Sequence, residues 1–212
     1  MTTSKQEIEV KLYTPNLKSI IAALEANGAS LKSERVFERN VRYEDHEFSL
    51  TPQGIVVRLR QDVRTLLTFK GPGIVENGII SREEFEVVVD DYDMMDLILG
   101  RLGYYPFMAY EKYRTTYELD GAEIVLDELP YGNFTEIEGD VATIEVMIQK
   151  LNLSDAERMP NSYAGLFDIV RQNMELTMAH LTFDAFEGIN VPAEAFIKQG
   201  ETKPPVVDDS DD

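Results

Sequence analysis

The chain has 212 residues, of which 43% are hydrophobic and 28% charged, and its formal net charge is -19 at pH 7. This composition predicts one globular domain with a sizeable core. The negative charge argues against a nucleic-acid-binding protein, because affinity for a phosphate backbone comes mainly from lysine and arginine. The sequence contains no cysteine, which excludes disulfides, zinc–thiolate sites, iron–sulfur clusters and cysteine nucleophiles.

Hydrophobic periodicity divides the chain into about eight strands with helices between the groups. Strands are expected at residues 5–13, 31–44, 54–61, 64–70, 79–89, 104–119, 122–128 and 133–139. Helices are expected at residues 15–26, 92–102, 141–151 and 161–180. The first helix has Thr14 before Pro15 at its start and Asn27-Gly28 at its end, which is typical helix punctuation.

One domain is therefore expected over residues 1–180, followed by an acidic tail over residues 181–212. Pro204-Pro205 and the aspartates of residues 208–212 leave little to bury, so disorder is predicted at least beyond Gln199. Three phenylalanines offer an alternative, docking of the tail on the domain or on a second copy of it, and a homodimer stays open. These are Phe183, Phe186 and Phe196.

The sequence also gives expectations about location. It has no run of eighteen apolar residues, so no membrane span is predicted. The opening segment, MTTSKQEIEV, lacks the basic and hydrophobic regions of a signal peptide. We expect a cytoplasmic protein with no membrane partner. Its twenty lysines and arginines are enough to form a pocket for a small anion.

Six short segments place polar, mostly charged residues at every second position. Because side chains on a strand alternate between its faces, each set projects from one side and apolar residues take the other. The positions are Glu7, Glu9 and Lys11; Arg58 and Arg60; Thr68 and Lys70; Glu84 and Glu86; Lys112 and Arg114; and Glu136 and Glu138. Acids and bases occur in similar numbers, which suggests a polar interior built around metal ions and an anion.

Strands of this kind predict an α+β fold. Eight antiparallel strands with one polar and one apolar face can form a closed eight-stranded antiparallel β-barrel with a polar interior, and helices packed outside can cover the apolar face. The alternative is an open antiparallel sheet with helices on one face and the charges in bulk solvent.

The order of the charged motifs resembles that of the CYTH family, also called the triphosphate tunnel metalloenzymes. The family's Glu-x-Glu-x-Lys strand is similar to Glu7, Glu9 and Lys11. The further matches, in order, are Val57-Arg58-Leu59-Arg60, Thr68-Phe69-Lys70, Glu84-Phe85-Glu86, Lys112-Tyr113-Arg114, Val125-Leu126-Asp127, Glu136-Ile137-Glu138 and Ser162-Tyr163-Ala164-Gly165-Leu166. The resemblance covers about residues 5–170.

The resemblance implies a triphosphate tunnel that binds a linear triphosphate together with Mg²⁺ or Mn²⁺. Carboxylates suit these hard cations, and lysine and arginine suit phosphate oxygens. The expected metal ligands are Glu7, Glu9, Asp127, Glu136 and Glu138. The expected phosphate-binding residues are Lys11, Arg58, Arg60, Lys70, Lys112 and Arg114. The expected catalytic residues are Lys11, Lys70, Glu84 and Glu86, the lysines as candidates to neutralise the leaving oxygen.

Other residues have less distinctive patterns. Arg39, Arg42 and Arg82 could also face inward, although arginine on a long strand is more often solvated. His46 and His180 are too few for a histidine metal site. The Ser162-Tyr163 pair either closes one tunnel mouth or packs a helix.

Three functions are compatible with the resemblance. The preferred one is hydrolysis of inorganic tripolyphosphate, a nucleoside triphosphate or thiamine triphosphate, with the absence of tryptophan a slight argument against thiamine. The second is a class IV adenylate cyclase, which forms cyclic AMP and pyrophosphate from ATP. The third is a non-catalytic module that binds polyphosphate or nucleotide, which would not need so many acids. The motifs do not name the group attached to the phosphates.

Overall fold

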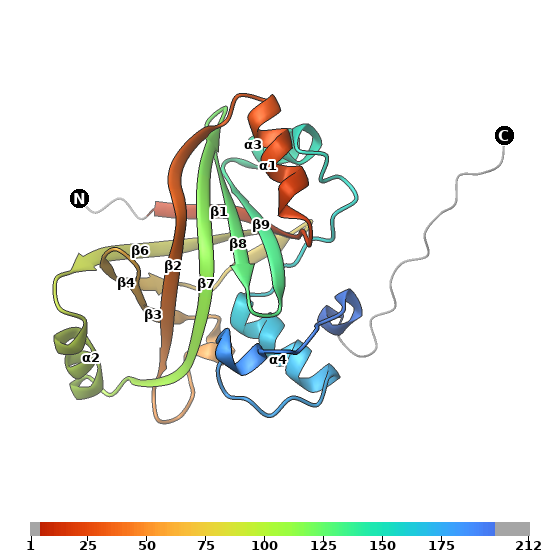
Figure 1. The fold of residues 1–212 in the computed structure, drawn as a ribbon. Coiled ribbons are helices and arrows are strands. Elements are labelled where there is room, and N and C mark those ends of the chain that lie inside the picture. Colours follow the sequence, from red (N-terminus) through yellow and green to blue (C-terminus); the bar gives the residue numbers. More distant parts are fainter. Residues whose placement is uncertain (1–4, 198–212) are drawn as a thin grey trace.

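The computed structural model describes residues 5–197 and contains nine strands and four α-helices within them (Figure 1). The strands are β1 (Lys5–Tyr13), β2 (Ser30–Glu44), β3 (Val56–Gln61), β4 (Thr65–Lys70), β5 (Ile74–Glu76), β6 (Ile79–Val89), β7 (Tyr105–Leu119), β8 (Ala122–Leu129) and β9 (Gly132–Glu138). The α-helices are α1 (Leu17–Ala26), α2 (Tyr92–Arg101), α3 (Val141–Lys150) and α4 (Tyr163–Asn173). None of these helices is long and apolar enough to cross a membrane.

Eight of the strands form a closed antiparallel ring. They are hydrogen-bonded in the order β1-β9-β8-β7-β2-β3-β4-β6, and β6 pairs again with β1. The ninth strand, β5, pairs only with β6 among the described strands. An open sheet would leave two strands of the eight with an unpaired edge, so this closure confirms the predicted α+β class and rules out the open-sheet alternative.

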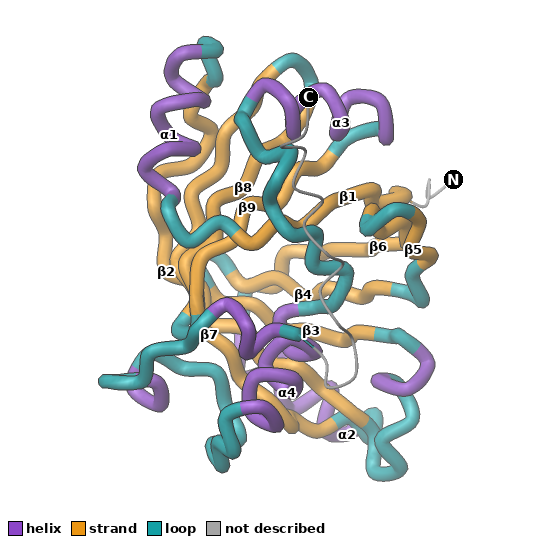
Figure 2. The backbone as a smooth tube through the Cα atoms, turned by 90° about the vertical axis from the view of Figure 1, so that its right-hand side faces the viewer, coloured by secondary structure: helices purple, strands orange, loops and turns teal. Residues whose placement is uncertain are grey.

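The two faces of each ring strand differ as the alternation predicts. On β1, Val10 and Leu12 are fully buried on the outer face, in a cluster with residues of α1 and α3. Glu9 and Lys11, which alternate with these two residues along the strand, project to the inner side. Helices α1 and α3 lie toward one end of the ring and α4 toward the other (Figure 2). The apolar core therefore lies outside the ring, between strands and helices.

A second core forms around α4. Leu166, Phe167 and Val170 of this helix are buried together with Phe134 of β9 and Tyr131 of the turn before it. The helix begins at the N-cap Ser162, whose hydroxyl accepts a hydrogen bond from the backbone N–H of Gly165. This packing holds the start of α4 at one end of the ring.

The segment that follows α4, beyond the domain boundary expected at residue 180, packs on the same core, as the docking alternative for its phenylalanines allowed. Leu181, Phe186 and Phe196 are almost fully buried, and the backbone of Leu181 exchanges hydrogen bonds with Ala109 and Glu111 of β7. Burial of these apolar side chains stabilises the segment against the domain. The expected disorder beyond Gln199 and the acidic cluster lie outside the described residues.

Two elements differ from the expected ones. Helix α4 ends at Asn173 rather than near residue 180, and Glu175 has a φ of 53° that a helix cannot accommodate. Met174 and Met178 still pack against the core from an irregular segment, so their apolar spacing did not require a helix. Strand β5 was missed, because three residues are too few to show an alternating pattern.

Candidate active site

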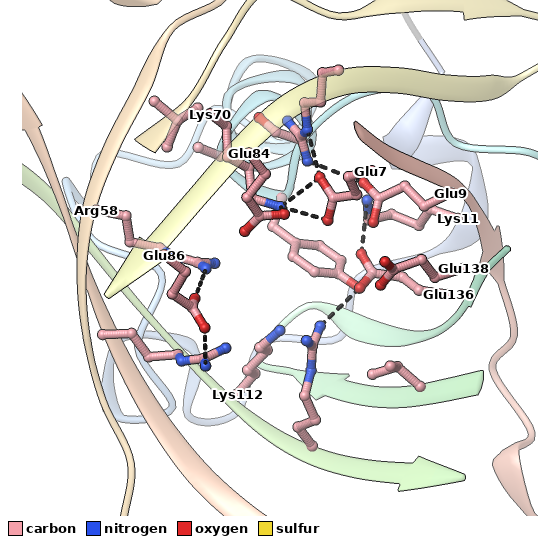
Figure 3. Close-up of a pocket in the computed structure, with 18 of the residues that line it drawn as sticks. Glu7, Glu9, Lys11, Arg58, Lys70, Glu84, Glu86, Lys112, Glu136 and Glu138 are labelled. Carbon is pink, nitrogen blue, oxygen red and sulfur yellow. Dashed lines mark hydrogen bonds and ion pairs between the residues drawn. The ribbon is translucent and has the colours of Figure 1, made fainter. Parts of the chain in front are cut away.

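The ring encloses a cavity of about 580 Å³ lined by residues from all eight ring strands and from the start of α4 (Figure 3). Its wall contains eight lysines and arginines and seven glutamates. The cavity is therefore net basic, although the whole chain has a net charge of -19. Every predicted site residue lines it except Asp127. These residues are Glu7, Glu9, Lys11, Arg58, Arg60, Lys70, Glu84, Glu86, Lys112, Arg114, Glu136 and Glu138.

Glu7, Lys70 and Arg82 form the first of the cavity's charge clusters, between β1, β4 and β6. Lys70 Nζ lies 2.8 and 2.9 Å from the two carboxylate oxygens of Glu7 and 3.2 Å from Glu84. Arg82 donates to Glu7 at 2.9 Å and to Glu9 at 3.1 Å. Burial opposes ionisation of Glu84, but Lys70 and its other partners hold the pKa of Glu84 below its usual range.

A second cluster joins β1, β7 and β9. Lys11 Nζ lies 3.0 Å from one oxygen of Glu136, and Arg114 donates to the other at 2.8 Å. Glu136 is buried, which alone would raise its pKa, but Lys11 and Arg114 hold that pKa well below the usual range. Burial alone would lower the pKa of Lys11, yet Glu136 and Glu9 raise it overall. Both groups therefore stay charged near neutral pH.

Asp127 lies behind this cluster, fully buried and outside the cavity lining. Arg114 donates to its two oxygens at 2.7 and 2.5 Å, and Lys112 and the hydroxyl of Tyr163 donate to one of them at 3.0 and 2.9 Å. Burial and the neighbouring Asp127 raise the pKa of Tyr163 well above its ordinary value, so its hydroxyl remains a donor. As the side chains stand, the four donors on its carboxylate make Asp127 a common partner of Arg114, Lys112 and Tyr163.

Glu38 on β2 is a second buried acid, which the sequence analysis did not single out. Lys112, Arg60 and Arg114 approach its carboxylate to 3.5, 3.7 and 4.0 Å. Burial opposes its ionisation, but these cations and Arg58 lower the pKa of Glu38 to about 2. The residue carried a usable signal: Glu38, Asn40 and Arg42 are polar at every second position of a long strand.

Arg58 contacts mainly hydroxyl groups. It donates to the hydroxyl of Tyr110 at 3.1 Å and to that of Thr68 at 3.2 Å, and its distance to Glu86 is 3.8 Å. Burial alone would raise the pKa of Tyr110, but the Arg58 guanidinium lowers it overall. Thr68 in turn donates to Glu86 at 2.9 Å, so the strand pair β4–β6 holds this carboxylate facing the cavity.

Of the three arginines with ambiguous patterns, two line the cavity and one does not. Arg42 and Arg82 belong to its wall, whereas Arg39 is exposed and its guanidinium lies 3.5 Å from the Tyr92 hydroxyl. His46 and His180 are exposed and do not line it. Ser162 and Tyr163 both line the cavity. Tyr110 and Glu123 also line it and were not predicted.

The predicted metal ligands are not gathered into a metal site as the side chains stand. Among residues 5–197, no three Asp, Glu or His side chains are grouped so that they could hold a metal ion. Glu7, Glu9 and Glu136 contact lysine or arginine instead. The backbone nevertheless places Glu138 directly opposite Glu9 on β1 and Glu123 on β8. Three carboxylates in one row across adjacent strands are the donor type that Mg²⁺ and Mn²⁺ prefer.

Comparison with known proteins identifies the family. The CYTH domain model matches residues 5–163, so the chain belongs to the CYTH family. A relative from Methanocaldococcus jannaschii, named "Putative adenylate cyclase MJ0240", is 25% identical over 173 residues, which cover 76% of this chain and 97% of the relative.

Solved structures support the same fold. That of "a putative adenylate cyclase" from Vibrio parahaemolyticus has a TM-score of 0.68 at 22% identity, covering 78% of this chain and 99% of the other. That of "Putative adenylyl cyclase HpAC1" from Hippeastrum, described as having a dominant triphosphatase activity, has a TM-score of 0.60 at 17% identity and covers 76% and 95%. Together with the charged cavity, these relatives are consistent with an enzyme of the CYTH type.

Proposed function

We propose that the chain is a divalent-metal-dependent triphosphate hydrolase. The ring of strands would act as a tunnel that binds inorganic tripolyphosphate or the triphosphate of a nucleotide. The observation that carries this proposal is the cavity wall itself, with eight cations and seven carboxylates from eight strands. A linear triphosphate presents negative oxygens along its length, which cations on several strands can contact together. The carboxylates would be superfluous for anion binding alone.

The ion pairs of the cavity support a mechanism in which partners are exchanged. Lys70 and Arg82 contact Glu7 and Glu9 at 2.8 to 3.1 Å. Phosphate oxygens would replace these carboxylates as partners of the two cations. Glu9 would then be free to act with Glu123 and Glu138, which occupy the same row, in holding Mg²⁺ or Mn²⁺. When bound, the cation would supply Lewis-acid neutralisation of phosphate charge.

The chain's own residues would supply the remaining steps. Lys11, Arg60, Lys112 and Arg114 would hold the phosphate chain, because their ammonium and guanidinium groups face the cavity from three strands. Lys70 would neutralise the leaving oxygen. Glu84 stays ionised beside Lys70, and it or Glu86 would orient the attacking water. No covalent intermediate is required.

The cavity wall favours hydrolysis over cyclisation. A cyclase must hold the nucleoside of ATP so that a ribose hydroxyl reaches the innermost phosphorus, and purine pockets are usually apolar. The lining contains few apolar side chains, namely Val56, Phe85, Val125 and Ala164, besides the rings of Tyr110 and Tyr163, whose hydroxyls are held by Arg58 and Asp127. Hydrolysis needs only the phosphate chain, the metal and water. The class IV adenylate cyclase reaction is the second candidate, because relatives carry that name.

The test is a product analysis of the purified protein with tripolyphosphate, ATP and thiamine triphosphate, each with Mg²⁺ or Mn²⁺. We expect inorganic phosphate as the main product. Cyclic AMP and pyrophosphate as the main products from ATP would contradict hydrolysis and support the cyclase. Binding without turnover under any metal condition would support a non-catalytic module instead.

A further inference from the structure

Arg42 on β2 differs from the other cations of the cavity in its partners. Each of the others has a carboxylate oxygen within 4.0 Å: Lys11, Arg58, Arg60, Lys70, Arg82, Lys112 and Arg114. Within residues 5–197, Arg42 forms no such ion pair. Its guanidinium lies 3.4 Å from the Thr51 hydroxyl, and its buried Nε has no hydrogen-bond partner.

This cation, which lies 5.3 Å from the centre of the Phe107 ring but has no carboxylate partner, is inside the protein. Arg42 is 7% exposed and lines the cavity, and it lies opposite Arg58 in the β2–β3 register. The Nε of Arg58 is also buried without a partner. Two neighbouring guanidinium groups repel each other, and their burial removes the water that would otherwise solvate them. Burial is the main reason that the pKa of Arg42 lies below its ordinary value.

The nearby acid Glu44 is engaged elsewhere. Its carboxylate accepts hydrogen bonds from the backbone N–H groups of Leu50 and Thr51 at 2.7 and 2.9 Å, and from the Thr51 hydroxyl at 2.7 Å. These contacts fix the loop after β2. Glu44 forms no ion pair with Arg42, so its carboxylate lies more than 4.0 Å from the Arg42 guanidinium. Glu44 and Asp168 of α4 favour the charged form of Arg42 without forming an ion pair with it, so its guanidinium can still take an anion from the cavity as a direct partner.

A second unsatisfied group lies beside this pair of arginines. Asn40 is completely buried, and neither its side-chain nitrogen nor its oxygen has a hydrogen-bond partner. In the strand register it stands between Arg60 of β3 and Tyr110 of β7, both of which line the cavity. Buried polar atoms are rarely left unpaired in folded proteins, because each costs about 1–3 kcal/mol. Unpaired polar atoms, including the Nε donors of Arg42 and Arg58 and the acceptor oxygen of Asn40, thus concentrate at and just behind one part of the wall.

We propose that Arg42 and Arg58, with the hydroxyl of Tyr110, form an anion subsite that takes a single phosphate group: free inorganic phosphate, or the end group of a bound triphosphate. The second of these ligands rests on the proposed function, and the first does not. A phosphate dianion can accept two hydrogen bonds from each guanidinium and would neutralise both buried charges. The Tyr110 hydroxyl, already 3.1 Å from Arg58, would add a neutral donor.

The subsite is distinct from the row of carboxylates formed by Glu9, Glu123 and Glu138. Tyr110 precedes Arg114 by four residues along β7, about 13 Å at strand rise, and Glu123 faces Glu118 still further along that strand. A triphosphate that reaches both regions would place its end group at Arg42 and its remaining phosphates nearer the carboxylates. Arg42 would thereby fix the direction in which the substrate enters.

Direct binding tests this subsite without any requirement for turnover. Inorganic phosphate and tripolyphosphate would be titrated calorimetrically into the wild-type protein, Arg42→Gln and Arg39→Gln. Arg39 is a matched control, because it is an exposed arginine on the outer face of the same strand. We expect Arg42→Gln to lose tenfold or more of the affinity for both anions, about the effect of one bidentate contact, and Arg39→Gln to bind as the wild type does.

Thermal unfolding provides the check on folding. Removing one of two neighbouring buried cations should leave the Tm of Arg42→Gln, without phosphate, at or above that of the wild type. Phosphate should raise the Tm of the wild type and of Arg39→Gln but not that of Arg42→Gln. If Arg42→Gln does not fold, Arg42→Lys tests the subsite instead, because lysine keeps the charge but not the two-donor geometry of arginine. We then expect Arg42→Lys to bind phosphate more weakly than the wild type.

The outcomes separate this inference from the proposed function. If Arg42→Gln binds phosphate and tripolyphosphate as tightly as the wild type, the subsite is overturned, even if tripolyphosphate is hydrolysed. If only Arg42→Lys can be tested, an unchanged affinity for phosphate in that variant overturns the subsite in the same way. Loss of phosphate binding in Arg42→Gln, in a protein that hydrolyses no triphosphate, would support the subsite and contradict the hydrolase.

Discussion

Glu38 and Lys112 occupy opposed positions in the β2–β7 register, and their almost fully buried side chains approach to 3.5 Å. Lys112 also contacts Asp127, at 3.0 Å. Lys112 lines the cavity, whereas neither acid does. The two acids therefore fix the position of the ammonium group of this cavity-lining lysine.

Substitution Glu38→Gln should make stability less dependent on acid pH. The pKa of Glu38 is depressed from 4.5 to about 2, so its ionised form contributes stability that is complete above about pH 4.5 and is lost as the pH falls toward 2. We expect Glu38→Gln to lower the free energy of unfolding by about 2 to 3 kcal/mol at pH 7, with a gap that narrows below pH 4.5. Urea unfolding of both proteins between pH 7 and pH 3 measures this difference in the free energy of unfolding.

The exposed Glu34 on the same strand is the control, and Glu34→Gln should change stability by less than about 0.5 kcal/mol. A destabilisation by Glu38→Gln that stays constant from pH 7 to 3 would show that shape, rather than charge, explains the loss.

Glu9→Ala and Lys70→Ala should each reduce turnover of tripolyphosphate by about a hundredfold or more, because each removes a charged group from the proposed metal or phosphate contacts. Their folds should persist, since Arg82 still contacts Glu7 when Lys70 is absent. The rate of phosphate release measures the loss of turnover, and circular dichroism checks that each variant keeps its fold. Glu83→Ala, at an exposed position of β6, should behave as the wild type. Near-normal activity in Glu9→Ala or Lys70→Ala would remove that residue from the proposed site.

Tyr163→Phe tests whether α4 influences the cations of the cavity. The change deletes the hydrogen bond to Asp127 but keeps the ring, whose centre lies 4.5 Å from Lys11 Nζ and 5.3 Å from Lys112 Nζ. We expect a loss of about 1 kcal/mol in stability and a several-fold rise in KM for tripolyphosphate, with kcat changed less. An unaltered KM would mean that Tyr163 serves packing alone.

Metal dependence should involve Glu123, a cavity residue that no recurring motif indicated. Chelation should abolish turnover, and Mg²⁺ or Mn²⁺ should restore it. In Glu123→Gln the metal concentration for half-maximal rate should rise about tenfold, because a neutral amide is a poorer ligand than a carboxylate. Full activity after chelation, or an unchanged metal requirement in this variant, would count against the carboxylate row.

The period-two pattern was sufficient to predict the ring strands and the inward side chains, because a strand must present successive residues on opposite faces. Glu7, Glu9 and Lys11 are the plainest case, since the intervening Val10 lies under helices. Their actual ion-pair partners could not be predicted, because these depend on which strands become neighbours in the ring. The pairing of β1 with β6 brings Arg82 opposite Glu7, for example.

Other features depend on tertiary packing, which the local pattern does not reveal: alternation marks one face of β2 as polar but does not show that this face is buried. Glu38 and Arg42 have the residue types of a solvated strand face, and only closure of the ring buries them. Asp127 matches a motif but does not line the cavity, because its buried carboxylate is covered by the side chains of Arg114 and Lys112. Phe196 is buried by its contact with Tyr13 at the end of β1, a partner more than 180 residues away.

The most direct measurement of the central claim is the initial rate of phosphate release from tripolyphosphate by the wild-type protein, with Mg²⁺ or Mn²⁺ and after chelation. The account predicts metal-dependent release that is lost in Lys70→Ala and retained in Glu83→Ala. Equal rates in Lys70→Ala and the wild type, or no release with either metal, would contradict it.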